Sequence, residues 1–167
     1  MKLTDFFLAQ LEREAPITRR ALEQVPEGHD DWKPHDKSMP LGHLANLVAS
    51  MPSWLTMTVN QNELELKPSG ENLSNALKTR KELVEAHDAH VAAAREALEN
   101  TTDEHLMKLW QLKVGGKVVH EQARYVVLTD SVFSHLAHHR GQLTVYLRLN
   151  EAKVPSIYGP SADDRTF

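Results

Sequence analysis

Two histidines lie four residues apart near the end of the chain, among otherwise apolar positions. If this segment is a helix, steps of three or four residues place His135 and His139 on one face. Side chains four residues apart on a helix have Cβ atoms about 5–6 Å apart, so their imidazole nitrogens can share one metal ion. Burying both rings without a partner would cost a few kcal/mol, which favours a bound ion. The apolar neighbours on this face are Leu128, Val132, Leu143 and Tyr146.

A third imidazole comes from a distant part of the chain. His43 lies near the start of a second predicted helix, and we expect it on the inner face with Leu47 and Trp54. The positive end of the helix dipole disfavours a protonated ring there, so His43 should stay neutral and able to bind a metal. The pattern therefore predicts one divalent ion held by His43, His135 and His139. The alternative is that each ring is a core histidine hydrogen-bonded to a backbone carbonyl.

Three imidazoles without a carboxylate would leave at least one coordination position of the ion open. Such an ion is a Lewis acid that suits hydrolysis, or it binds a thiol as its thiolate for thiol transfer. Alternatively, the ion only joins the two helices and catalyses nothing, or the bundle binds no metal. Imidazole suits zinc, nickel, copper and iron alike, so the ligands do not choose the metal. No catalytic side chain is predicted.

The other histidines are not expected to bind the metal. His138 lies off the apolar stripe and is expected beside the ligands or at the surface. No organic cofactor is predicted, because Gly115-Gly116 is interpreted as a turn and no Gly-rich phosphate-binding loop occurs. The remaining histidines lie on predicted loops or polar helix faces, where we expect exposure: His29, His35, His87, His90, His105 and His120.

Four helical segments would position the predicted ligands, which indicates an all-α fold and a four-helix bundle. The last helix is expected from about Glu121 to Leu149. Alternating residues from Trp110 to His120, around two glycines, predict a small hairpin or tight loop before it. The other helices are expected from Thr4 or Asp5 with an interruption near Pro16, from a Ser38 cap with a kink at Pro52, and from Asn72 or Ser74 to about Leu98.

The composition is that of a folded protein. A chain of 167 residues, 41% hydrophobic and 25% charged, suits one domain over residues 1–167. Nineteen basic and 23 acidic residues give a net charge of −4 without a basic stripe, which argues against a nucleic-acid partner. No cysteine occurs, and no run of about 18 apolar residues predicts a membrane segment. We expect a cytoplasmic protein.

The residues around the paired histidines resemble a known family. Residues 135–148, His-Leu-Ala-His-His-Arg-Gly-Gln-Leu-Thr-Val-Tyr-Leu-Arg, are similar to the signature of the DinB/YfiT-like superfamily of bacterial helical metalloproteins. Trp32-Lys33-Pro34, followed by Ser38 and Gly42-His43-Leu44, resembles the family's loop into its second helix. Residues 154–161 resemble the C-terminal tail of the family.

The resemblance implies a four-helix bundle, often a homodimer, with nickel or zinc held by three histidines that map onto His43, His135 and His139. Some members of the superfamily are thiol-dependent transferases or isomerases, so a small-molecule or thiol substrate is expected. The resemblance also implies that the tail from Ser156 to Pro160 folds over the mouth of the site, with Tyr158 as a lid. The alternative is a mobile terminus.

Overall fold

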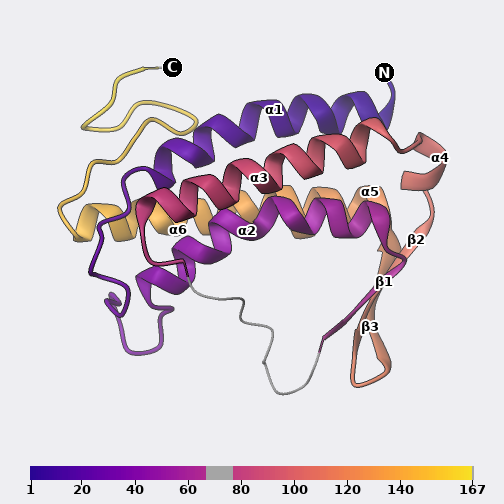
Figure 1. Cartoon of the computed structure of the whole chain (residues 1–167), viewed down its shortest axis with the longest axis horizontal. Coiled ribbons are helices and arrows are strands. Elements are labelled where there is room, and N and C mark those ends of the chain that lie inside the picture. Colours follow the sequence, from indigo (N-terminus) through magenta and orange to yellow (C-terminus); the bar gives the residue numbers. More distant parts are fainter. Residues whose placement is uncertain (67–76, 167) are drawn as a thin grey trace.

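The computed structural model describes residues 1–66 and 77–166, and most of them are helical (Figure 1). The elements are α1 (Leu3–Leu22), α2 (Leu41–Asn60), β1 (Glu63–Leu66), α3 (Arg80–Glu99), α4 (Asp103–Leu106), β2 (Leu109–Val114), β3 (Lys117–Ala123), α5 (Arg124–Val127), the π-helix η1 (Leu128–Ser134) and α6 (His135–Leu149). The helices α1 and α6 run in one direction, whereas α2 and α3 run in the opposite direction (Figure 1). The expected helical character is confirmed, and the chain also contains a small sheet.

A carboxylate from a distant residue caps the first helix. The backbone N–H groups of Leu3 and Thr4 donate to the two oxygens of Asp103 at 2.9 and 3.0 Å. These bonds satisfy donors that the first turn of a helix leaves free, and the negative charge suits the positive end of the dipole. The expected cap by Thr4 or Asp5 is wrong, because the helix already begins at Leu3. The interruption expected near Pro16 is also absent from α1.

Backbone carbonyls of the preceding loop cap the second helix. The N–H of Leu41 donates to the carbonyl of Trp32 at 2.8 Å, and that of Gly42 donates to the carbonyl of Asp30 at 2.9 Å. The expected cap by Ser38 is therefore wrong. A Cβ at Gly42 would lie 2.9 Å from Oδ1 and 3.2 Å from Cα of Asp30. The loop can approach α2 this closely only because residue 42 is a glycine.

The other helix boundaries also differ from the sequence expectations. The helix α2 continues through Pro52 to Asn60. Thr79 and Glu82 form a capping box that starts α3, while the predicted starts at Asn72 and Ser74 lie outside the described residues. The final helical segment begins after β3, later than the expected Glu121, because residues up to 123 still pair in the sheet.

The sheet has the order β1-β2-β3 and lies at the end of the molecule where α1 begins (Figure 1). The strands β2 and β3 form an antiparallel hairpin through Gly115 and Gly116, which both have positive φ. This confirms the hairpin predicted from the two glycines. The strand β1 pairs in parallel with β2 and was not predicted, because its polar segment showed only four alternating residues.

A buried arginine joins this sheet to the helices. Arg124 is 1% exposed, and its guanidinium donates to the carbonyls of Thr58 and Gln61 near the end of α2, each at 3.0 Å. It also donates to the carbonyl of Leu109 at the start of β2 at 2.8 Å. A cation at the C-terminal end of α2 satisfies carbonyls that have no partner within the helix and suits the negative end of its dipole.

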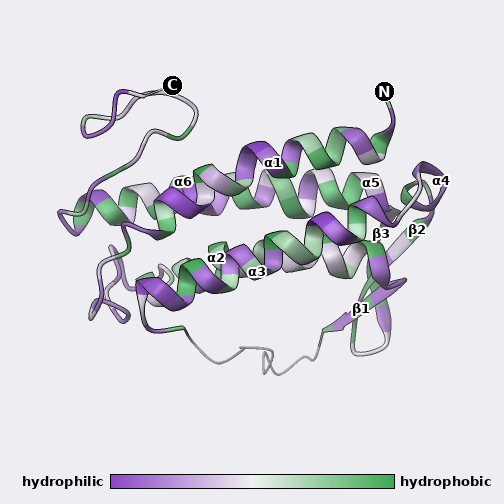
Figure 2. Cartoon of the chain, turned by 45° about the horizontal axis from the view of Figure 1, so that its top comes forward, coloured by the Kyte–Doolittle hydropathy of each residue, from purple (hydrophilic) through white to green (hydrophobic). Residues whose placement is uncertain are grey.

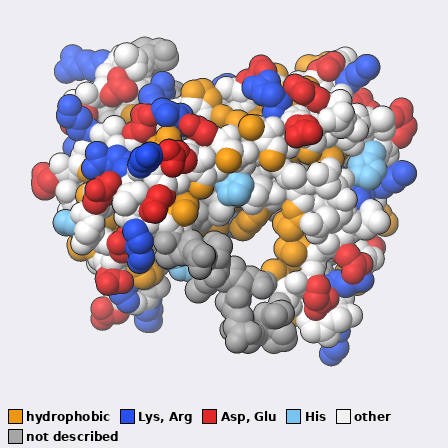
Figure 3. Space-filling view, in the orientation of Figure 1, with side chains coloured by type: hydrophobic (Ala, Val, Ile, Leu, Met, Phe, Trp, Pro, Cys, Tyr) orange, Lys and Arg blue, Asp and Glu red, His pale blue; other side chains and the backbone are white. Residues whose placement is uncertain are grey.

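The apolar faces of the helices enclose two clusters of buried residues, with hydrophilic residues on the outer faces (Figure 2). Trp54 of α2 packs against both clusters. On the face drawn in Figure 3, acidic and basic side chains are mixed over the helices. Within residues 1–66 and 77–166, none of the helices has the length and apolar content that a membrane span requires.

Candidate metal centre

His135 and His139 occupy the first two turns of α6 and face each other. Their Nε2 atoms are 2.8 Å apart, and their ring centroids are 4.5 Å apart. His139 is buried, at 7% exposure, while His135 is half-buried at the edge of the core. The prediction that both rings share one helix face is confirmed.

Gln142 determines which nitrogen of His139 carries the proton. Its Oε1 lies 2.8 Å from Nδ1 of His139 and can only accept a hydrogen bond, so Nδ1 must donate. The Nε2 atom of His139 is then left with a lone pair, which points at His135. A polar partner on the second ring nitrogen is the usual way in which a metal-binding histidine is oriented.

His139 is held in its neutral form. Burial lowers the pKa of His139 below its usual value, and this is the largest effect. The hydrogen bond to Gln142 raises the pKa, whereas the charges on His135, His138 and His43 would lower it. A neutral imidazole is the form that donates a lone pair to a metal ion.

His43 lies near this pair but not on the inner face of α2. Its side chain is exposed, so the expectation that it points into the core is wrong. The core face of α2 is formed instead by residues such as Leu44 and Val48. His43 lies on the same flank as Trp54, whose ring centroid is 5.5 Å from that of His135. This flank brings His43 within electrostatic range of His139.

Two of the three predicted ligands are in contact, and the third is nearby. Within residues 1–66 and 77–166, no three His, Cys, Asp or Glu side chains are already gathered as a complete metal-binding group. The chemistry of the donors nevertheless fits a divalent ion. Two imidazoles converge, one is kept neutral by burial, and its second nitrogen has a fixed partner.

The environments of the other histidines agree only partly with expectation. His138 is exposed, with its ring centroid 4.9 Å from that of His139, as expected for a residue beside the predicted ligands. His87 was expected to be exposed but is 1% exposed, and its Nε2 donates to the carbonyl of Ala15 at 3.0 Å. His29, His35 and His120 are exposed, while His90 and His105 are half-buried.

Comparison with known proteins identifies the family. The model of the DinB family matches residues 1–166, almost the whole chain. The chain belongs to the DinB family. The search of curated proteins finds no match.

Two solved structures have the same fold as this DinB family member. A DinB-like protein from Bacillus cereus is 22% identical with a TM-score of 0.70, and the alignment covers 91% of this chain and 95% of that one. A DinB-like protein from Bacillus subtilis is 19% identical with a TM-score of 0.64, over 95% of this chain and 98% of that one. At these identities the likeness shows the fold alone.

On the side of α6 that faces α1, away from the imidazoles, this DinB chain contains a buried ion pair that was not predicted. Arg140 of α6 is fully buried and donates to Oε2 of Glu14 in α1 at 2.7 Å and to the hydroxyl of Thr18 at 2.8 Å. The sequence contained a signal for this ion pair, because Glu14 and Arg140 each lie on an otherwise apolar helix face. Opposite charges on facing apolar stripes indicate a pair, since a lone buried charge is very costly.

The C-terminal tail packs against this ion pair. The hydroxyl of Tyr158 donates to Glu14 at 2.8 Å, and its ring lies 5.0 Å from Cζ of Arg140. Arg20 also donates to the carbonyl of Ser156 at 2.9 Å. The tail is therefore held in place, and Tyr158 covers the ion pair between α1 and α6 rather than the imidazoles.

A π-helix precedes the two histidines of α6. The seven residues of η1 end at Ser134, directly before His135. Such wider turns are rare and often occur at functional sites. The sequence predicted an unbroken α-helix here, because a π-helix differs in its hydrogen bonds and not in its residue types.

Proposed function

We propose that this protein is a divalent-metal-dependent enzyme, a hydrolase or a thiol-dependent transferase, whose zinc or nickel ion is held by His43, His135 and His139. The observation that carries the proposal is the convergence of the Nε2 atoms of His135 and His139, 2.8 Å apart, with Gln142 bonded to the far nitrogen of His139. His43 would complete the ligand set from α2.

The chain's own residues have separate parts in this proposal. His135 and His139 present nitrogen atoms, Gln142 orients His139, and burial keeps His139 neutral. A bound divalent ion would supply Lewis acidity. Because His43 is exposed and His135 is half-buried, the site would lie at the surface, where a small-molecule or thiol substrate can reach it.

An open coordination position distinguishes the enzyme from a structural site. The inner stripe of the last helix offers no carboxylate, and the chain has no cysteine. An ion held by three imidazoles would then keep a position for a substrate, as catalytic zinc sites do. The alternative, in which the ion only joins α2 to α6, requires a closed site.

Elemental analysis of protein purified without a histidine tag tests the metal assignment. We expect about one divalent ion per chain, because the chain has a single proposed three-histidine site. The His139→Ala variant should lose this ion. His120→Ala removes an exposed histidine of β3 and serves as the matched control. Stoichiometric metal in a variant with alanine at all three proposed ligands would show that the assignment is wrong.

A cobalt-substituted sample tests the open position. A thiol added to this sample should change the visible spectrum of the ion, because the thiolate occupies the free position. If no small ligand changes the spectrum and chelation greatly lowers the melting temperature, the structural alternative is correct.

The assembly and location expected from the sequence belong to the same proposal. We treat the four long helical segments as one four-helix bundle, and the protein as a cytoplasmic homodimer. Light scattering should then give twice the mass of 18.9 kDa for one chain. A monomer mass at high concentration would contradict the dimer without affecting the metal site.

A further inference from the structure

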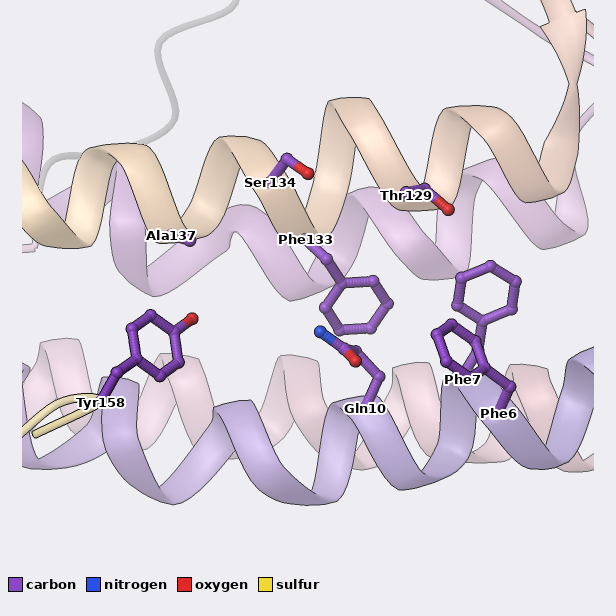
Figure 4. A pocket seen from close by; sticks show the side chains of 8 residues that line it. All are labelled: Phe6, Phe7, Gln10, Thr129, Phe133, Ser134, Ala137 and Tyr158. Atoms are coloured by element: carbon purple, nitrogen blue, oxygen red, sulfur yellow. The ribbon is translucent and has the colours of Figure 1, made fainter. Parts of the chain in front are cut away.

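A second candidate site lies on the opposite side of the last helical segment from the histidine pair. A pocket with a volume of about 170 Å³ opens between α1 on one side and η1 with α6 on the other (Figure 4). His135 faces Trp54 of α2, whereas this pocket faces α1. The two sites are therefore separate, and nothing below depends on a bound metal.

Three phenyl rings form one end of the pocket. The rings of Phe7 and Phe133 are nearly parallel, with centroids 6.0 Å apart and an interplanar angle of 6°. Phe6 packs edge-on against Phe7 at 5.3 Å. Aromatic faces and edges attract another flat ring beyond the gain from apolar burial alone. An apolar cavity of about 150 Å³ accommodates benzene, so the volume here suits a substituted benzene ring.

Polar groups in the walls limit the chemistry of the ligand. Ser134 contributes a hydroxyl from η1, and Gln10 contributes an amide from α1 (Figure 4). Ser134 is exposed and its side chain makes no capping hydrogen bond to α6, which leaves the hydroxyl available to a ligand. The lining residues carry no charge, so an ionised ligand group would lose water without gaining a counter-charge.

The far end of the pocket is fixed in position. Tyr158 forms this wall, and its hydroxyl is bonded to Glu14, while Arg140 lies against its ring. Because Glu14 and Arg140 are buried, this part of the tail is anchored to the interior. A preformed wall reduces the ordering that a ligand must impose when it binds.

We propose that this pocket binds a small, neutral aromatic molecule with one hydrogen-bonding substituent, of the size of phenol or benzamide. The ring would lie against Phe7 and Phe133, and the substituent would bond to the Ser134 hydroxyl. An aliphatic molecule of the same size gains less from the phenyl rings, and an aromatic carboxylate is disfavoured by its charge.

Fluorine NMR of 4-fluorophenol with the full chain tests this proposal. We expect saturable binding with a Kd on the order of 1 mM, as suits a ligand of this size. Ala137 of α6 also lines the pocket (Figure 4), so Ala137→Leu places a larger side chain there and should weaken binding at least about tenfold. The matched Ala89→Leu, on the exposed face of α3, should leave the affinity unchanged.

A second variant keeps the test decisive if Ala137→Leu disturbs folding. Ser134→Ala should weaken the binding of 4-fluorophenol about fivefold, which corresponds to the loss of one hydrogen bond. The affinity for fluorobenzene, which has no hydroxyl, should not change. The proposal is overturned by the absence of saturable binding to the wild-type chain. The proposal would also be overturned if cyclohexanol displaced 4-fluorophenol as well as phenol does, or if 4-fluorobenzoate bound as tightly as 4-fluorophenol. A change of mass in light scattering with Ala137→Leu would show that a second copy of the chain occupies the pocket, which again overturns it.

Discussion

At the scale of single residues, Gln142 determines which ring nitrogen of His139 is free to bind a metal ion. Because its side-chain oxygen accepts from Nδ1, only Nε2 can bind a metal ion. Gln142→Ala should therefore weaken metal affinity by about 10-fold or more, as loss of such a partner usually does. Competition with a coloured chelator measures this change. Gln142→Glu still accepts the hydrogen bond and should retain most of the affinity.

Gln122→Ala is the matched control for this experiment, because Gln122 is exposed on β3. It should bind the metal as tightly as the wild type. Equal affinities for Gln142→Ala and the wild type would show that Gln142 does not orient a ligand.

The ion pair of Glu14 and Arg140 should contribute strongly to stability, because both side chains are almost completely buried. Arg140→Met removes the buried counter-charge of Glu14 and leaves its carboxylate only the Tyr158 hydroxyl and the exposed Arg13, so it should lower the free energy of unfolding by about 3–5 kcal/mol. Glu14→Leu combined with Arg140→Met removes both charges and should recover much of this loss. Urea denaturation measures all three proteins.

The exposed pair of Arg148 and Asp163 provides the comparison on the same helix. Arg148→Met should change the free energy of unfolding by no more than about 1 kcal/mol, since solvent screens the pair. Similar losses for Arg140→Met and Arg148→Met would contradict the importance of burial.

At the scale of elements, two glycines of the family-like motifs have different roles. A side chain at Gly42 would collide with the backbone and side chain of Asp30, so Gly42→Ala should destabilise the fold by about 1–3 kcal/mol. Apart from its chain neighbours and the backbone of its own helix, no atom of the described residues lies within 4 Å of the Cβ that would be added at Gly141 within α6. Gly141→Ala should therefore stabilise the protein by up to about 1 kcal/mol. Thermal unfolding that ranked the two variants in the reverse order would contradict the packing at the start of α2.

His87 joins α3 to α1 and makes stability depend on pH. Burial lowers the pKa of His87 from 6.5 to about 4 in the folded chain. The unfolded chain therefore binds a proton more readily than the folded chain between these two pH values. Stability is fully present above about pH 6.5 and falls as the pH drops toward 4, by a total on the order of 3 kcal/mol.

Denaturation of wild type and His87→Gln over this pH range tests the contribution. Glutamine can still donate to the carbonyl of Ala15 but does not titrate, so the variant should lose less stability on acidification. His120→Gln changes an exposed histidine and should keep the slope of the wild type. Parallel curves for His87→Gln and wild type would contradict the buried, neutral state of His87.

The sequence predicts an element best where its signal is local. Gly115-Gly116 indicated the hairpin, and apolar spacing indicated the helices and the face shared by His135 and His139. The strand β1 depends on pairing with residues more than 40 positions away, and the cap of α1 comes from Asp103. Neither contact can be recognised from the residues that are adjacent to it in the sequence. The position of His87 could have been found, because it lies four residues after buried Leu83.

At the scale of the whole molecule, the last helical segment separates the two proposed sites. Its α2 side carries the imidazoles, and its α1 side carries the aromatic pocket and the buried ion pair. The helix face that His135 and His139 share followed from spacing, whereas the place of His43 at the surface depended on how α2 is rotated against α6. Helical spacing alone does not determine that rotation, because neighbouring faces of α2 were both partly apolar.

The central claim is that His43, His135 and His139 hold one metal ion, and anomalous X-ray diffraction tests it most directly. Crystals of the untagged protein would be measured at the absorption edge of the metal found in solution. We predict one anomalous peak per chain, about 2.0–2.1 Å from nitrogen atoms of all three imidazoles. A metal peak bound by other side chains, or the absence of a peak between α2 and α6 in metal-loaded crystals, would contradict the account.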